Sequence, residues 1–164
     1  MNIRDEGTAD RGAIHDLIRQ AFGREAEAAL VDALRRDGDI VGALVAEHDQ
    51  KIIGHVVLSR LISPDGSLAL GPVSVLPERQ RQGIGAALIR SCVEQAGKAE
   101  WEAIFVLGEP AYYERLGFRA ETAIGFETPY PVHNFMALEL KKGALLARCG
   151  PVEYPRAFAA LPVD

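Results

Sequence analysis

The residues best suited to chemistry lie in a glycine-rich turn at Gln80-Arg81-Gln82-Gly83-Ile84-Gly85. An apolar run precedes this turn and a helix-forming stretch follows it. Glycines let a backbone bend and come close to a ligand, and a helix that starts there points free amides and its positive dipole end at the turn. Because Arg79 and Arg81 add positive charge, the turn is suited to phosphate oxygens.

Two common phosphate-binding motifs do not fit this turn. The phosphate loop of nucleotide hydrolases needs a lysine after its last glycine, and none follows Gly83 or Gly85. The dinucleotide fingerprint, started at Gly83, would place its third small residue at position 88, which is Leu88. The pattern that remains is Gln-x-x-Gly-x-Gly, and the competing interpretation is a plain chain reversal that binds nothing.

Candidates for proton transfer lie on both sides of the turn. Tyr113 begins the pattern Tyr-x-x-x-Gly-Phe and could donate a proton or a hydrogen bond, although two neighbouring tyrosines can also simply pack. A general base could be Glu109, His55, Glu78 or a chain of water molecules. Cys92 falls on an apolar helix stripe and is expected in the core. The histidines, cysteines and carboxylates do not have metal-ligand spacing, so we expect no metal.

Two helices, a run of strands and a third helix must position these residues. A cap at Thr8 or Asp10 begins the first helix, and the second has its apolar face at Ala26, Ala29, Leu30, Ala33 and Leu34. The third helix is expected at residues 86–96, and a short fourth at residues 110–116. Strands are expected at residues 2–4, 40–47, 52–61, 67–75, 103–107, 118–123 and 135–140. The segment 67–107 predicts a parallel strand–helix–strand crossover, so the fold is α/β.

Composition limits the class of protein and its partners. The chain has 164 residues, 48% of them hydrophobic and 25% charged, which predicts one domain spanning residues 1–164. Its net charge of -5 gives no overall positive field, so neither nucleic acid nor a membrane is expected as a partner. Two cysteines outside any Cys-x-x-Cys pair, and the lack of a signal peptide or long apolar stretch, predict a cytoplasmic protein.

The turn, behind a Val-x-Val-x-Pro strand end, resembles the coenzyme A signature of the GNAT superfamily of N-acetyltransferases. The order of elements over about residues 1–140 is also similar, which leaves residues 141–164 as a C-terminal extension. The closest likeness is to bacterial predicted small N-acetyltransferases that share Leu-Gly-x-Pro-Ala-Tyr-Tyr, Pro-Tyr-Pro and Phe-Met-Ala-Leu-Glu-Leu. The resemblance implies an α/β (α+β) fold with a central mixed, mostly antiparallel sheet flanked by helices.

The resemblance also implies acetyl-CoA or coenzyme A as the cofactor and names the residues that would bind it. These are Val73, Val75, Gln80, Arg81, Gln82, Gly83, Ile84, Gly85 and Ala86. Pro72 cannot donate to a strand partner and predicts a bulge or splay, and in this fold the freed backbone beyond it pairs with the pantetheine arm. Tyr113 would stand near the coenzyme sulfur as donor to the departing thiolate, and Glu109 is the first candidate for the base.

The reaction implied is direct attack of a primary amine, on a small molecule or a protein, on the acetyl thioester. Two alternatives stay open: a non-catalytic acyl-CoA-binding or sensor module, and an acyltransferase with another acyl donor or a hydroxyl acceptor. The acceptor pocket is expected between the first two helices, the loop around Tyr130 and the tail near Tyr154. The protein could be a monomer or a homodimer, with Phe135, Met136 and the tail as a dimer contact.

Overall fold

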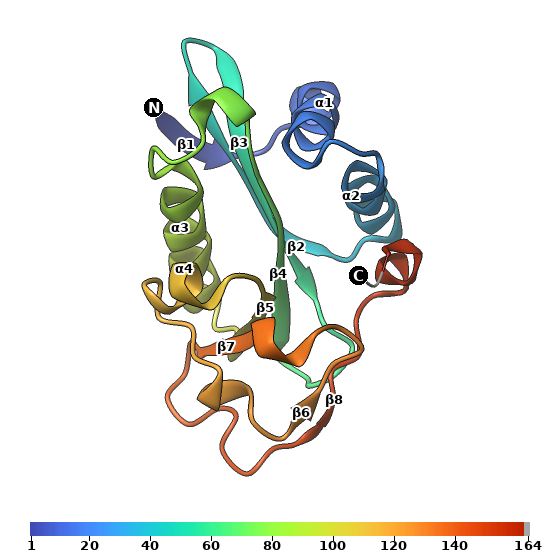
Figure 1. Ribbon diagram of the computed structural model, residues 1–164, viewed down its shortest axis with the longest axis vertical. Helices are drawn as coiled ribbons and strands as arrows, with labels where there is room; N and C mark the ends of the chain where they lie inside the picture. Colours follow the sequence, from blue (N-terminus) through green and yellow to red (C-terminus); the bar gives the residue numbers. More distant parts are fainter. Residues whose placement is uncertain (163–164) are drawn as a thin grey trace.

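A six-stranded sheet forms the centre of the protein in the computed structural model, which describes residues 1–162 (Figure 1). Its strand order is β1-β2-β3-β4-β5-β7. The strands are β1 (Asn2–Asp5), β2 (Ile40–His48), β3 (Lys51–Arg60), β4 (Ser67–Val75), β5 (Ala103–Leu107) and β7 (Phe135–Glu139). Only the β4–β5 pair is parallel among these neighbours. The predicted mixed, mostly antiparallel sheet and its parallel crossover are therefore confirmed.

Helices cover both faces of this sheet. Figure 1 shows α1 (Arg11–Phe22) and α2 (Ala26–Asp37) on one side and α3 (Ile84–Lys98) on the other. Along β2, Ala43 and Val45 pack with α1 and α2, whereas Leu44 and Ala46 pack with the α3 side. This alternation follows the two-residue period of a strand. Because both faces are covered, most side chains of the central strands are apolar on both faces, with His55 of β3 and Ser74 of β4 among the buried polar exceptions.

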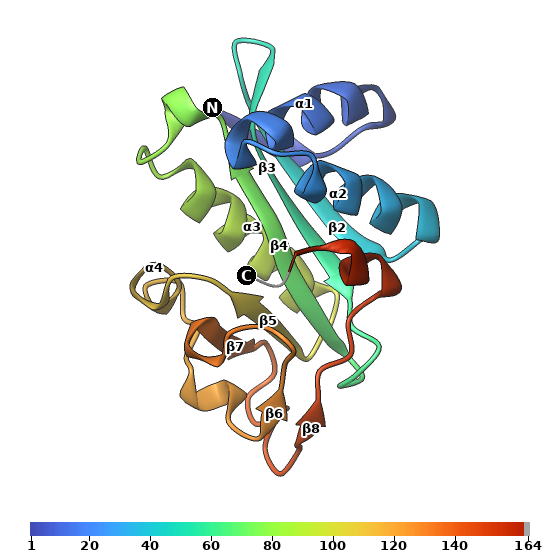
Figure 2. The same cartoon turned by 45° about the vertical axis from the view of Figure 1, so that its right-hand side comes forward.

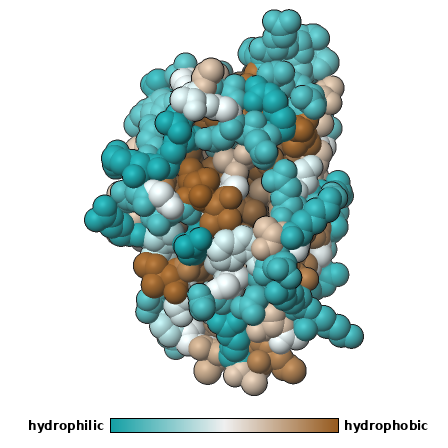
Figure 3. Space-filling view, turned by 180° about the vertical axis from the view of Figure 1, so that it is seen from behind, coloured by the Kyte–Doolittle hydropathy of each residue, from teal (hydrophilic) through white to brown (hydrophobic). Residues whose placement is uncertain are grey.

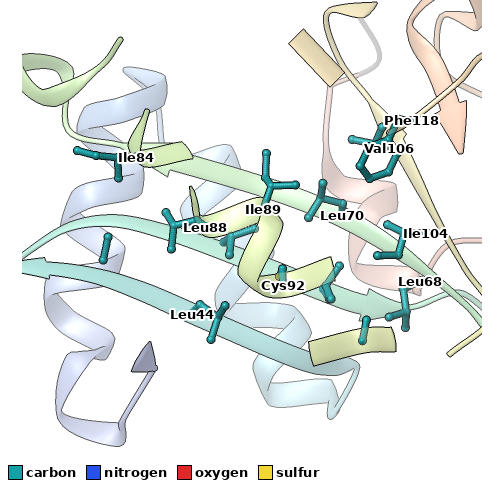
Figure 4. Close-up of a cluster of buried hydrophobic side chains, with 14 of the residues drawn as sticks. Leu44, Leu68, Leu70, Ile84, Leu88, Ile89, Cys92, Ile104, Val106 and Phe118 are labelled. Carbon is teal, nitrogen blue, oxygen red and sulfur yellow. The ribbon is translucent and has the colours of Figure 1, made fainter. Parts of the chain in front are cut away.

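The contact between α3 and the sheet buries the cysteine that the sequence placed in the core. Leu88, Ile89 and Cys92 lie on the side of α3 that meets the strands (Figure 4). Burial raises the pKa of the Cys92 thiol to about 12, so the thiol stays protonated at neutral pH. Cys92 is therefore a core residue, as predicted.

The buried face of α2 differs from the predicted one. Ala29 is exposed, and the buried side chains are Glu27, Ala28, Leu30, Val31 and Leu34. The helix is rotated because burying Val31 together with the leucines removes more apolar area from water than burying alanines would. The rotation carries a glutamate, Glu27, onto the buried face.

The predicted strand at residues 118–123 is wrong. Arg119 forms only an isolated bridge with Ala137, and Glu121–Ala123 is a 3-10 turn. Phe118 and Ala123 are buried in this segment, and their odd separation would place them on opposite faces of a strand. The chain instead forms β6 (Phe126–Glu127), which pairs in parallel with β8 (Gly150–Pro151) in a second, two-stranded sheet.

The segment after β8 returns to α2. A 3-10 helix at Arg156–Ala160 lies beside α2 (Figure 2), and Arg156 bonds both carboxylate oxygens of Asp37 at 3.2 Å. Figure 2 shows the same segment passing in front of the sheet above β5 and β7. Residues 156–160 therefore pack on the body formed by the earlier residues.

The outer surface is mostly hydrophilic on the face seen from behind, with a small hydrophobic group near its centre (Figure 3). No helix within residues 1–162 is long and apolar enough to cross a membrane.

Phe135 is 4% exposed and Met136 1% exposed. Both side chains face the core although β7 is the edge strand of the sheet, so they offer no exposed side-chain surface for the predicted dimer contact.

A buried charge cluster joins the sheet to α2. His55 Nε2 lies 2.8 Å from Glu6 Oε1, and Arg35 donates to Glu6 Oε2 at 2.9 Å. His55 is fully buried. Burial alone would raise the pKa of Glu6, but its contacts with His55 and Arg35 outweigh burial and hold that pKa below its usual value of 4.5. The ionised carboxylate is therefore the form that stabilises the fold.

Replacing Glu6 with glutamine is expected to lower the free energy of unfolding by about 2 kcal/mol, because Arg35 loses its ionic partner. The contribution of ionised Glu6 is complete above pH 4.5 and is lost as pH falls through its lower folded pKa. Denaturant unfolding between pH 7 and pH 3 should therefore show the difference between wild type and Glu6→Gln shrinking below pH 4.5. Glu94→Gln is the control, since Glu94 pairs with Lys98 on the exposed surface of α3 and little change is expected. A difference independent of pH would contradict the assignment.

Candidate functional site

Strands β4 and β5 part near the middle of β4. They pair only where Ser67–Leu70 faces Ala103–Val106. Opposite β3, the register shifts between Val56 and Leu58, so β4 carries an extra residue around Gly71 and Pro72. The predicted bulge at Pro72 is present. Beyond it, no strand in the described part of the chain pairs with β4 on its β5 side, which leaves backbone groups there open to a ligand.

The glycine turn connects this free end of β4 to α3. Gly83 is the N-cap of α3 with φ of 82°, a left-handed conformation that glycine adopts at little cost. The first amides of α3 lack intrahelical partners and point back toward the turn. A Cβ on Gly85 would lie 2.8 Å from Tyr112 Oη. Gly85 thus faces Tyr112 of α4 (Pro110–Glu114).

A cavity of about 740 Å³, here called the turn cavity, lies between the turn, β4 and α4. Its walls are Val73, Val75, Arg79, Gln80, Arg81, Gly83, Ile84, Gly85, Ala86, Arg90, Tyr112, Tyr113 and Arg115. Eight of the nine predicted binding residues are among them. The exception is Gln82, whose side-chain amide lies 3.5 Å from the Glu78 carbonyl oxygen.

The turn cavity is strongly cationic. Four arginines line it and, within residues 1–162, no acidic side chain does. Arg90 and Arg115 were not predicted. Arg90 lies seven residues after Gly83 on the same face of α3, a helical spacing that could have revealed it. Guanidinium groups bind phosphate oxygens bidentately, so the cavity fits a polyphosphate ligand.

A second cavity of about 380 Å³, here called the aromatic cavity, adjoins the first. It is lined by Phe22, Glu27, Leu30, Ala69, Leu70, Gly71, Pro72, Val73, Phe105, Val106, Leu107, Tyr113, Tyr130, Tyr154, Phe158, Leu161 and Pro162. The segments predicted to surround an acceptor, namely the first two helices, the Tyr130 loop and the tail, do line one cavity. Val73 and Tyr113 line both cavities, so the two meet at these side chains.

Tyr113 is held at this junction by aromatic contacts. Its ring meets Phe118 edge-on at 5.7 Å between ring centroids and Tyr112 at 5.1 Å. Burial, reinforced by Tyr112, raises the pKa of the Tyr113 phenol to about 12. Tyr113 therefore remains protonated well above neutral pH and can act as a hydrogen-bond donor to either cavity.

The predicted candidates for a base lie outside both cavities. Glu109 precedes α4 and is exposed, and Glu78 is exposed beside the turn. His55 is buried in β3 against Glu6. The roles of Glu109 and Glu78 stay predictions, whereas the packing interpretation of His55 agrees with its position. In residues 1–162, no group of three or more histidines, cysteines and carboxylates is arranged to hold a metal ion.

Glu27 is a further carboxylate in the site, which the sequence did not predict. It lines the aromatic cavity, with its side chain 8% exposed. The spacing of Glu27, Leu30 and Val31 on one helical face was a usable sign, because a charged residue on an apolar stripe is unusual. Because the alanines of α2 are compatible with several helical faces, this stripe was not distinct in the sequence.

Comparison with known proteins identifies similar chains. A family model described as an acetyltransferase (GNAT) domain matches residues 39–120, which include the glycine turn and Tyr113. The uncharacterized N-acetyltransferase YhbS of Escherichia coli K12 is 32% identical over 164 residues, covering 96% of this chain and 98% of YhbS. The uncharacterized N-acetyltransferase YjhQ of the same strain is 34% identical over 132 residues, covering 76% of this chain and 73% of YjhQ.

Two crystal structures resemble the protein along nearly its whole length. The GNAT family N-acetyltransferase YhbS from Escherichia coli, in complex with CoA, has a TM-score of 0.93 and 29% identity, covering 99% of this chain and 93% of that one. A GNAT family acetyltransferase from Brucella melitensis, in complex with acetyl-CoA, has a TM-score of 0.82 and 33% identity, covering 96% and 97%.

Proposed function

This chain belongs to the GNAT acetyltransferase family, and we propose that it transfers an acetyl group from acetyl-CoA to a primary amine of a small molecule or protein. The observation that carries the proposal is the meeting of two unlike cavities at Tyr113, one lined by arginines and one by aromatic side chains. Relatives solved with CoA and with acetyl-CoA support the choice of donor. We further propose that residues 1–164 act as one domain.

The turn cavity would hold the coenzyme through its phosphates and its pantetheine arm. Free amides at the start of α3 and the guanidinium groups of Arg79 and Arg81 suit the phosphates. The side of β4 at Val73 and Val75 suits the amide groups of the arm, because no strand pairs with it there on the β5 side. The Val75 carbonyl oxygen accepts from Gln80 Nε2 at 3.1 Å, which leaves the Val75 amide and the Val73 backbone for the arm. The Val75 amide is the proposed donor to the oxygen that becomes negative when the amine attacks.

Tyr113 would stabilise the thiolate that leaves. A phenol with a pKa of about 12 facing a thiol near 8.5 makes complete proton transfer unfavourable by about 3.5 pH units, or about 5 kcal/mol. A hydrogen bond from Tyr113 to the sulfur needs no such transfer. We therefore assign Tyr113 as a hydrogen-bond donor whose proton stays largely on the phenol.

The amine must also lose a proton before or during its attack. Glu109 remains the predicted base, and because its side chain lines neither cavity, it would need a chain of water molecules to reach the amine. Direct removal would need a group inside the aromatic cavity.

The proposed function is tested by incubating the protein with acetyl-CoA and a panel of amines and measuring thiol release and product mass. We expect thiol release that depends on an amine and a matching N-acetylated product. Tight coenzyme binding without release for any amine would instead identify a non-catalytic acyl-CoA-binding module. Products acylated on a hydroxyl, or release only with longer acyl donors, would identify a different acyltransferase.

Replacing Gly108 with alanine is expected to lower kcat about 10- to 100-fold. A Cβ on Gly108 would overlap ring carbons of Tyr113, so the ring must move from the junction of the cavities, and small displacements of a reacting group have effects of this size. Steady-state kinetics would measure the loss, and calorimetry should show coenzyme A affinity within about threefold of wild type. Gly97→Ala is the control, because a Cβ there meets no atom within 4 Å. Equal kcat for Gly108→Ala and Gly97→Ala would show that the Tyr113 position is unimportant.

A further inference from the structure

The two cavities carry opposite charge. Four arginines line the turn cavity, whereas Glu27 is the only ionisable side chain other than tyrosine among the described residues that line the aromatic cavity. The Glu27 carboxylate forms an ion pair with Arg24, which lies outside this cavity. The aromatic cavity therefore offers one negative charge in otherwise uncharged walls.

Glu27 has unused capacity to bind a cation. Arg24 donates to it through Nε at 2.8 Å and through Nη2 at 2.5 Å, one bond to each carboxylate oxygen. A carboxylate has about four acceptor positions, so these two bonds leave others available. Arg24 does not line the cavity, and its side chain is 46% exposed. The pair with Arg24 offsets the cost of burying Glu27, and the remaining acceptor positions of the carboxylate can serve a ligand in the cavity.

The rest of the cavity suits an apolar or aromatic body. Tyr154 packs against Tyr130 and Phe158, each with a distance of 5.3 Å between ring centroids. Burial raises the pKa of Tyr154 to about 12 and raises that of Tyr130, so both phenols are neutral at physiological pH. A volume of about 380 Å³ is within the range of small-molecule sites.

The same walls disfavour a second charge on the ligand. A carboxylate on the amine, as in an amino acid, would be repelled by Glu27. A second ammonium group, as in a polyamine, would find no other carboxylate on the walls described. Either of these second charges would be buried without an ionic partner. Amino acids and polyamines are therefore expected to bind more weakly than an amine with a single charge.

We propose that Glu27 is the specificity-determining residue of the acceptor site and that the acceptor is a small primary amine with an apolar or aromatic body and no second charge. This inference rests on the proposed function, because it takes the aromatic cavity as the place where the amine binds. Glu27 accepts hydrogen bonds from the ammonium group of the incoming amine, and the aromatic side chains enclose its body.

The test separates the charge of Glu27 from its structural role by using two probes of similar shape. 2-Phenylethylamine is a cation and 2-phenylethanol is neutral, and NMR titration would measure the Kd of each for the full-length protein saturated with coenzyme A. In Glu27→Gln, we expect the Kd of the amine to increase about 10- to 100-fold, because a charge-assisted hydrogen bond is lost. The Kd of the alcohol should change less than about twofold. Glu25→Gln is the matched control, since Glu25 is exposed and lines neither cavity.

Two binding results would overturn the inference. If neither probe weakens in Glu27→Gln, the carboxylate does not hold the amine. If both weaken equally, Glu27 only supports the cavity through Arg24. Phenylalanine and spermidine should bind wild type at least 10-fold more weakly than 2-phenylethylamine, and tighter binding of either would also overturn the inference.

Product analysis with acetyl-CoA and the same amines tests the proposed function separately. Glu27-dependent binding of 2-phenylethylamine without any acetylated product would leave the binding inference standing and remove the proposed function. Acetylation of other amines without any Glu27-dependent binding would support the proposed function and remove the binding inference.

Discussion

Replacing Gly85 with aspartate should weaken coenzyme A binding at least 100-fold, or about 2.8 kcal/mol. A Cβ at this position would lie 2.8 Å from Tyr112 Oη and 3.8 Å from side-chain carbons of Val73 and Val75, so the new side chain must enter the turn cavity. Its carboxylate would repel the phosphates and compete for the arginines that line the cavity. Isothermal titration calorimetry with coenzyme A would measure the effect.

Gly12→Asp gives a control with the same chemical change. Gly12 lies in the first turn of α1, is exposed and has no atom within 4 Å of an added Cβ. It lines neither cavity. We expect its coenzyme A affinity to stay within about twofold of wild type and both variants to remain folded by circular dichroism. Wild-type affinity in a folded Gly85→Asp protein would mean that the phosphates are not held at this turn.

The glycine turn could be predicted because its geometry is set by neighbouring residues. Gly83 takes a left-handed conformation that few other residues accept, and the next residue, Ile84, begins α3. The position of Pro72 likewise predicted where β4 would be interrupted. Such features depend on one or two residues and their spacing, so the sequence contains nearly all the information needed.

The rotation of α2 could not be predicted in the same way. Ala26, Ala28, Ala29 and Ala33 are compatible with several faces, because alanine has a high helix propensity and little apolar area to bury. The choice among these faces depends on how α2 packs against the sheet and the C-terminal segment. Since that packing involves distant residues, the buried position of Glu27 became apparent only in the structure.

The aromatic cavity also depends on distant contacts. Phe22, Tyr130 and Tyr154 belong to segments separated by many residues, and they come together because β6 pairs with β8 and the tail returns to α2. The strand expected at residues 118–123 would have made this region part of a regular sheet. Instead, the short pairing of Phe126–Glu127 with Gly150–Pro151 directs the tail toward the cavity. Local periodicity contains no information on such pairing.

Replacing Tyr113 with phenylalanine should lower kcat about 100-fold while changing the Kd of coenzyme A less than about threefold. The phenol at the junction of the two cavities is the proposed donor to the thiolate, and loss of such a donor has effects of this order. The ring itself, with its edge-on contacts to Tyr112 and Phe118, is kept. Steady-state kinetics and calorimetry together separate the loss of the hydroxyl from a loss of binding.

The pH dependence gives this assignment an independent test. Because the pKa of Tyr113 is raised to about 12, its donor proton is present at lower pH and is lost only as pH approaches that value. Wild-type kcat should therefore increase with pH as the bound amine loses its proton, with no decline from Tyr113 below about pH 11. Tyr112 lines only the turn cavity, so Tyr112→Phe should alter coenzyme A affinity more than kcat. If Tyr113→Phe kept wild-type kcat, the thiolate would have to be stabilised by another donor, and the junction at Tyr113 would no longer account for the chemistry.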